Sequence, residues 1–279
     1  MKNILKIMLM MITIYTIAGS AVYAAEIPVS DQDQLITSRD WTEISNLQDE
    51  MKKEEPDATI DYDKALKVYV DCNLIKLQTA DAKKLISALE SANYVWVIPF
   101  KMEKTYGMFT VAKGLPLREE AKSVLTKAEQ EEVKNHAGKW MITEIAEHTV
   151  EPYYDILLEK REALSDCTRV VLVGSQPGMR QPVALGMDDE TARIWISLGY
   201  QYPVMEKIPE TQNVESGVYS FDSVAEISDT YIEDSEVSTG AGVQSRSSMK
   251  YVAGIGIIVI GSILIFSVLK KKKLEQSGE

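Results

Sequence analysis

Two apolar stretches without charge stand near the ends of the chain, and the first covers residues 7–18. It follows Lys2 and Lys6 and leads to Val22 and Ala24, which stand in the two small-residue positions before the predicted cleavage point. A short basic region, an apolar core and small residues at the cleavage point are typical of a secretory signal peptide. We therefore predict a signal peptide over residues 1–24. An uncleaved signal anchor is the alternative, but a spanning helix needs about 20 residues.

The second apolar stretch is the nineteen residues 251–269, followed at once by four lysines at 270–273. A helix of this length reaches about 28 Å, close to the ~30 Å hydrocarbon core of a bilayer. Because basic residues mark the cytoplasmic side, we predict a single-pass protein of the cell membrane, with its N-terminal domain outside and residues 270–279 as a basic cytoplasmic tail. Gly254 and Gly261 share one helix face, which permits a homodimer through this helix, although they form no GxxxG pattern.

Between the two ends, the apolar positions predict a mixture of helices and strands. Trp41, Ile44, Leu47 and Met51 recur at helical spacing, whereas residues 66–72 alternate between apolar and polar. The predicted helices cover 39–53, 80–92, 117–136 in two pieces and 153–164, and the predicted strands cover 66–72, 94–98, 106–112, 140–148, 169–173, 182–185 and 192–198. Helices mixed with hairpins favour an α+β domain with a mainly antiparallel sheet and several helices.

Two polar segments flank this predicted domain. Residues 25–37 follow the signal peptide and are polar, so we expect a flexible N-terminal segment. Residues 222–250 are acidic, rich in Ser, Thr and Gly, and poor in bulky apolar residues. Such a composition buries too little surface to offset its ordering entropy. We therefore predict an extracytoplasmic domain at 38–221 and a stalk at 222–250 that leads to the membrane.

The charge of the chain is concentrated in its predicted exported part. The whole chain has 30 Lys and Arg against 42 Asp and Glu, a formal net charge of −12. Seven of the basic and two of the acidic residues lie outside 25–249, which leaves 23 − 40 = −17 for that part. Neutralising nucleic-acid phosphates requires a basic face, so we expect no nucleic acid as a partner. The expected partners are cationic, neutral or apolar.

The sequence contains few residues that could carry out catalysis or hold a metal. Its 2 His and 2 Cys are too few for a zinc cluster of the usual spacing. It has no nucleophile elbow, P-loop or dinucleotide-binding fingerprint. His136 stands in the last turn of a predicted helix, where it complements the helix dipole, and we read His148 as a solvated polar residue. We therefore predict no catalytic, metal-binding or cofactor-binding residues.

Cys72 and Cys167 are the only cysteines, and both belong to the predicted exported domain. An oxidising compartment permits a disulfide between them, and its long loop would constrain the unfolded chain by ~4 kcal/mol in the loop-entropy model. The alternative is two buried free thiols in neighbouring strands. The sequence leaves both alternatives open, because the distance between the two residues is unknown.

An aromatic platform is the best candidate for a binding site. Strand alternation over 192–198 places Trp195 on one face together with Arg193, while Tyr69 lies on the polar face of its own strand. Tyr202 follows shortly after Trp195. Exposed Trp and Tyr rings stack on sugars or anchor protein partners. We single out Trp195, Arg193, Tyr69 and Tyr202, with the alternative that helices cover this face and that Trp195 belongs to the core.

These observations favour a non-enzymatic surface module that binds a protein or an envelope glycan, presented on a stalk above the membrane. The alternative is a membrane-anchored envelope hydrolase that uses carboxylates, since acidic pairs such as Asp188 and Asp189 are frequent. A structural or sensor subunit is a third option, and it would need a partner near the membrane, because the tail has only ten residues.

Overall fold

The computed structural model describes residues 27–148, 151–174, 176, 179, 182–199, 205–208 and 213–228. The predicted signal peptide, transmembrane helix and cytoplasmic tail lie outside these residues. Within the described ranges, no helix combines the length and the apolar character that crossing a membrane requires.

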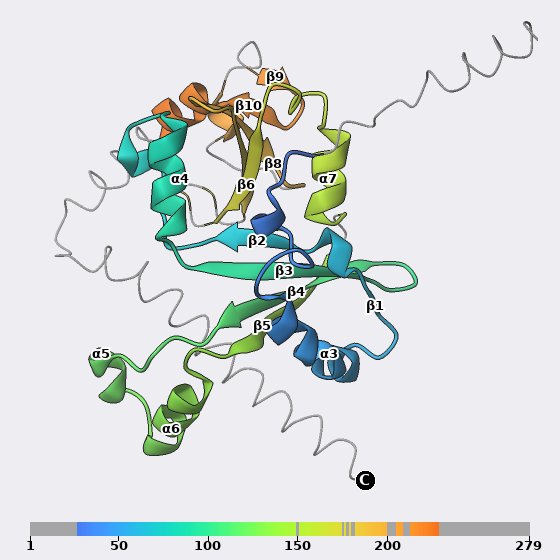
Figure 1. Ribbon diagram of the computed structural model, residues 1–279, viewed down its shortest axis with the longest axis vertical. Coiled ribbons are helices and arrows are strands. Elements are labelled where there is room, and N and C mark those ends of the chain that lie inside the picture. The colour runs from blue at the N-terminus through green and yellow to red at the C-terminus, as the bar shows by residue number, and fades with distance from the viewer. Residues whose placement is uncertain are drawn as a thin grey trace, which may run out of the picture.

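Ten strands form one mostly antiparallel sheet, which together with several helices confirms the predicted α+β class (Figure 1). The strands lie in the order β5-β4-β3-β2-β6-β7-β8-β10-β9, and β1 pairs with β3 beside this path. Their bounds are β1 (Thr59–Ile60), β2 (Leu66–Tyr69), β3 (Tyr94–Lys101), β4 (Tyr106–Lys113), β5 (Trp140–His148), β6 (Arg169–Val173), β7 (Val183–Met187), β8 (Ala192–Ser197), β9 (Asn213–Glu215) and β10 (Val218–Ser220). The seven longest are the strands that the hydrophobic pattern predicts, with small shifts in their bounds.

The helices agree with the predicted ones but are shorter. Their bounds are α2 (Trp41–Ile44), α3 (Gln48–Glu54), α4 (Ala82–Glu90), α5 (Glu119–Lys122), α6 (Lys127–His136) and α7 (Tyr153–Glu159), with 3₁₀ turns η1 (Asp31–Asp33), η2 (Ser45–Leu47), η3 (Tyr62–Lys64), η4 (Ile75–Leu77) and η5 (Met205–Lys207). A further helix covers 221–228. A capping box between Thr126 and Glu129 is present at the start of α6. Asp81 caps α4, because its side chain accepts from Lys84 N.

The first half of the sheet consists of β1 to β5, and α2 and α3 cover one of its faces. Ile44 and Met51 from these helices are fully buried against Trp96 of β3. Apolar residues at helical spacing on α2–α3 therefore meet apolar residues at strand spacing on β3 and β4. Gly107 is required in β4, because a Cβ there would lie 2.1 Å from the ring of Phe100.

The second half of the sheet consists of β6 to β10 and is covered on both faces. The helix at 221–228 and α4 pack on one face, where Leu85 and Leu89 join the buried cluster around Val171 and Leu185. On the other face α7 packs with Leu157 against a second cluster. Figure 1 shows α4 and α7 on opposite sides of β6. Burial on both faces explains why the sequences of β6 and β7 are nearly continuous apolar runs.

The two halves meet at β2 and β6, which are the parallel neighbours among the named strands. They pair through only two residue pairs, Val68 with Leu172 and Tyr69 with Val173. Toward their N-terminal ends the two strands have no further pairs with each other. We call the gap between these ends the fork.

Residues 27–40, which we call the strap, fill the fork. Val29 forms a bridge with Val170 of β6, and Gln34 forms a bridge with Leu66 of β2. In Figure 1 the strap is the dark blue ribbon near the centre, beside β2 and β6. The strap therefore bonds to both halves of the sheet where they do not bond to each other.

The strap also passes from one face of the sheet to the other. Ile27 packs in the cluster that contains Leu157 of α7. Leu35 packs in the cluster beneath α2 and α3. Val68 belongs to the first of these clusters and Trp96 to the second, on opposite faces of the sheet. We predicted that residues 25–37 are flexible, but Ile27, Val29 and Leu35 of this segment are buried in the core.

The domain also extends further than predicted at its other end. We assigned residues from 222 onward to a stalk, yet 221–228 form a helix in which Val224 and Ser228 are fully buried. Ser220 caps this helix, since its Oγ accepts from Ser223 N at 3.2 Å. The remainder of the predicted stalk lies outside the described residues.

Candidate functional site

The predicted aromatic platform is part of the core. Arg193 and Trp195 share a face of β8 as the alternation predicts, but Trp195 is 0% exposed. The ring of Phe221 stacks on it, with centroids 5.7 Å apart and planes inclined by 12°. The prediction of an exposed Trp195 is therefore wrong, and the alternative of a covered face is correct. Its physical reason is the helix at 221–228, which the sequence analysis assigned to the stalk.

The other members of the predicted platform lie in different surroundings. Tyr69 is buried in the same cluster as Trp195, so the structure brings these two together as core residues. Arg193 is exposed, and its Nε donates to Asp188 Oδ2 at 2.6 Å. Tyr202 lies outside the described residues. No shared surface therefore joins Tyr69, Trp195 and Arg193.

Cys72 and Cys167 are free thiols in the structure. Cys72 packs against the cluster beneath α4, whereas Cys167 is buried in the cluster beneath α7, on the other face of the sheet. This separation agrees with the alternative of two free thiols. Burial and then the charge of Asp166 raise the pKa of Cys167 to about 11. Burial also raises the pKa of Cys72. Both are therefore thiols, and not thiolates, near neutral pH.

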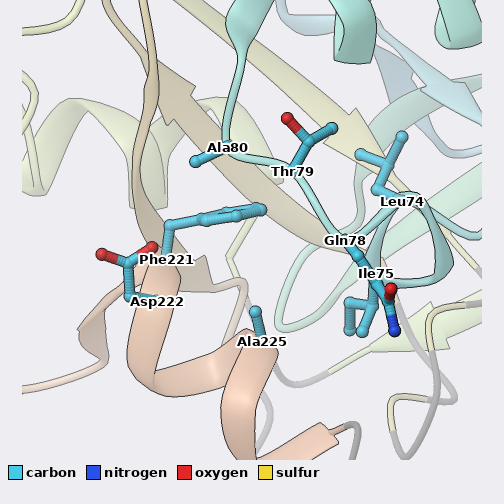
Figure 2. Close-up of a pocket in the computed structure, with 8 residues that line it drawn as sticks. All are labelled: Leu74, Ile75, Gln78, Thr79, Ala80, Phe221, Asp222 and Ala225. Atoms are coloured by element: carbon cyan, nitrogen blue, oxygen red, sulfur yellow. The ribbon is translucent and has the colours of Figure 1, made fainter.

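A shallow depression of about 190 Å³ opens between the loop after η4 and the helix at 221–228 (Figure 2). Its floor is apolar and its rim is polar, and the residues that line it are Leu74, Ile75, Gln78, Thr79, Ala80, Phe221, Asp222 and Ala225. Figure 2 shows the ring of Phe221 reaching across from the helix toward Ala80 and Ile75. The lining holds one carboxylate, that of Asp222.

Hydrogen bonds fix the chain around this depression. The buried Gln176 amide accepts from Leu74 N at 3.0 Å and donates to Cys72 O at 2.6 Å. On the far side of the loop, Ala192 N of β8 donates to Ala80 O at 2.7 Å. The loop is therefore held at both ends by hydrogen bonds within the domain.

Two residues of the loop have unusual properties. Gln78 has a φ of 47° and ψ of 41°, in the left-handed region that non-glycine residues seldom occupy. Such conformations are strained, and they persist where the surrounding structure maintains them, often at binding sites. Leu77, directly beside it, is 42% exposed. Leu77 does not line the depression, but its exposed apolar side chain lies on the same loop and is available for contact with a ligand.

Sequence reasoning missed the depression because its two walls lie about 140 residues apart, and one of them was assigned to the stalk. The sequence does contain a signal for the helix that forms the second wall. Phe221, Val224 and Ser228 fall at helical spacing after Ser220, which can cap a helix. That pattern predicts a short amphipathic helix.

A second polar constellation lies in the fork and is buried. Asp33 of the strap is 2% exposed. Its Oδ1 is 3.3 Å from Lys67 Nζ and accepts from the Tyr69 hydroxyl at 2.7 Å, and its Oδ2 accepts from Arg169 Nη2 at 3.0 Å. The aromatic rings of Tyr94 and Trp96 lie 4.7 Å and 5.3 Å from Lys67 Nζ. Burial and the charge of Asp33 raise the pKa of Tyr69, which stays a neutral donor.

Asp40, at the end of the strap, is also buried. Its Oδ2 accepts from the Tyr94 hydroxyl at 2.8 Å and from Trp96 Nε1 at 3.1 Å. The nearest cation is Arg39, 3.9 Å away, with a side chain that is 87% exposed. Both buried carboxylates thus bind the strap to the sheet and do not line an open cleft.

Among the described residues, no group of three or more His, Cys, Asp or Glu is arranged to hold a metal ion. The chain matches no model of a known protein family, no curated protein and no solved structure.

Proposed function

We propose that this chain is a membrane-anchored extracytoplasmic surface protein whose domain is a non-enzymatic binding module for a protein. The sequence supports the anchoring through the apolar stretches at 7–18 and 251–269 and the lysines at 270–273. The depression supports binding, because it combines an apolar floor with a polar rim on a loop that is already held in shape. Binding sites are typically concave, apolar and preformed in this way.

The geometry of the depression favours a protein side chain over a sugar ring. Phe221 is only 4% exposed, so its face is not available to stack on a sugar. The volume of about 190 Å³ suits one apolar side chain rather than an oligosaccharide. Leu77, which precedes Gln78 in the same loop, adds an exposed apolar side chain next to the lining residues in the chain. The strongly acidic exported part favours a partner that is neutral or cationic around this apolar anchor.

Photo-crosslinking in intact cells tests the binding proposal. A photoreactive residue at position 77 of the full chain should give a discrete protein adduct, and Ala225→Arg, which fills the depression, should abolish it. Two controls use the exposed α5–α6 region: a photoreactive residue at Val124, which is 80% exposed, and Ala128→Arg on α6. Equal adducts from positions 77 and 124, or an adduct that survives Ala225→Arg, would contradict the assignment of the depression.

Protease treatment of intact cells tests the location separately. Extracellular protease should remove the domain and leave the C-terminal tail detectable only after permeabilisation. Mass spectrometry of the mature chain should find an N-terminus at Ala25. A domain protected in intact cells would contradict the orientation, and a chain that retains Met1 would contradict cleavage.

A further inference from the structure

The buried constellation in the fork has the composition of an anion site. Lys67 comes from the first half of the sheet and Arg169 from the second half, and both converge on one carboxylate that neither half supplies. The hydroxyl of Tyr69 points to the same carboxylate. Charge-assisted hydrogen bonds from Lys, Arg and a hydroxyl are the usual means of binding a carboxylate in a dry environment.

The sheet positions the three donors, and the Gln32 carbonyl of the strap also accepts from Lys67 Nζ. Lys67 and Tyr69 belong to β2 and Arg169 begins β6, and these strands are paired just beyond the fork. The rings of Tyr94 and Trp96 restrain the Lys67 ammonium from the side. Such pre-organisation is what a binding site requires.

Asp33 does not accept from all the N–H donors of the site. It engages Arg169 through Nη2 alone, and the buried Nε of Arg169 has no hydrogen-bond partner among the described residues. A guanidinium can bind a carboxylate through two parallel N–H groups. A carboxylate that is not constrained by the strap can therefore form one more hydrogen bond than Asp33 does.

We propose that Lys67, Tyr69 and Arg169 form a carboxylate-binding site, and that the strap closes this site by placing its own Asp33 there. The ligand class is a carboxylate, supplied in this structure by the chain itself. The proposal is independent of the depression and of its proposed protein partner, which lie outside the fork.

Chemical rescue tests the site. In the detergent-solubilised full chain, Asp33→Gly leaves the two cations without a counter-ion and opens space for a small acid. Sodium formate should raise the Tm of Asp33→Gly saturably, by about 3–6 °C at ten times its dissociation constant. Sodium chloride at the same ionic strength should not do so. If Asp33→Gly does not fold in chloride, the refolding yield in formate against chloride is the measurement instead.

Three controls restrict the interpretation. Wild type should not respond to formate, because Asp33 fills the site. Asp40→Gly removes a carboxylate that binds neutral donors, and it should not respond either. Adding Arg169→Leu to Asp33→Gly should remove the response. Formate that stabilises Asp33→Gly no more than wild type and Asp40→Gly, or that acts equally without Arg169, would overturn the proposal.

Discussion

Asp33 and Asp40 are two buried carboxylates on the same strap, and the sheet stabilises them in different ways. Asp33 lies in the fork and binds cations from both halves of the sheet, Lys67 and Arg169. Asp40 lies over the first half alone and binds two neutral donors of β3. The negative charge of Asp33, at the junction of the two halves, is thus compensated by two cations. The negative charge of Asp40, within the first half, is compensated by hydrogen bonds from neutral donors. The bonds of Asp33 therefore join the two halves of the sheet, whereas the bonds of Asp40 attach the strap to the first half alone.

Because the two carboxylates are stabilised differently, removing each of them should destabilise the domain to a different extent. Removing one member of a buried ionic group leaves the remaining charges without compensation, which is strongly destabilising. Removing an acceptor of neutral donors leaves those donors unsatisfied, which costs less.

The largest effect is therefore expected for Asp33→Ala. Lys67, which is buried, and Arg169, which is half-buried, would lose their shared counter-ion, and the free energy of unfolding should fall by about 3–5 kcal/mol. Urea unfolding followed by tryptophan fluorescence measures it. A loss below that of Asp40→Ala would refute the distinction between the two carboxylates.

A smaller loss is expected for Asp40→Ala. The Tyr94 hydroxyl and Trp96 Nε1 would lose their acceptor, and the unfolding free energy should fall by about 1–3 kcal/mol. The same urea titration measures it, and Arg39→Ala is the matched control, because the Arg39 side chain is 87% exposed. The comparison fails if Arg39→Ala is as destabilising as Asp40→Ala.

The accessibility of Cys167 can sharpen the comparison without complete unfolding. Cys167 shares a buried cluster with Ile27 and Val29 of the strap, so loosening the strap at the fork should expose its thiol. At pH 8, well below its pKa of about 11, Cys167 should be alkylated more slowly than Cys72 in the wild type. Asp33→Ala should accelerate alkylation of Cys167 more than Asp40→Ala does. Peptide mapping after timed iodoacetamide treatment measures both rates.

The rate at Cys72 serves as the internal reference, because the apolar cluster against which it packs includes no described residue of the strap. Equal acceleration at both cysteines would indicate general loosening rather than release of the strap. A higher pH should raise both alkylation rates, because more of each thiol becomes thiolate. The alkylation rate of Cys167 should continue to rise up to about pH 11.

The smallest effect is expected for Thr126→Ala in the capping box of α6. The Thr126 Oγ1 accepts from Glu129 N at 3.3 Å, and loss of such a cap costs about 1 kcal/mol of helix stability. No residue of α6 is buried, so the loss should be local. Hydrogen exchange should therefore quicken in α6 while the strap keeps its protection. Faster exchange in the strap would show that the two regions are coupled.

Local sequence patterns predicted most of the fold. The β3–β4 hairpin and the capping box of α6 depend on neighbours in the chain, and both are present. The predictions failed where burial depends on distant segments. Trp195 shares a strand face with Arg193 as predicted, yet a helix more than twenty residues later covers it. The apolar residues of the strap are too sparse to show a period, so Leu35 could not be recognised as core.

The sites were less predictable than the fold, for the same reason. Nothing near Lys67 in the sequence indicates an aromatic surround, because Tyr94 and Trp96 reach it only through the pairing of β2 with β3. Arg169 reaches Asp33 only through the parallel pairing of β2 with β6. Such contacts follow from strand order, which periodicity does not reveal.

The bond between Asp33 and Arg169 spans 136 positions of the chain, and this separation orders the events of folding. Contacts between distant residues form late, because the entropy of closing the intervening loop opposes them. The strap is synthesised before the strands that it joins. Its carboxylate finds both cations only after β6 has been made and placed beside β2. The bonds of the strap to β6 are therefore the last to form, and an incomplete chain that lacks β6 leaves Asp33 without Arg169 and Val29 without Val170.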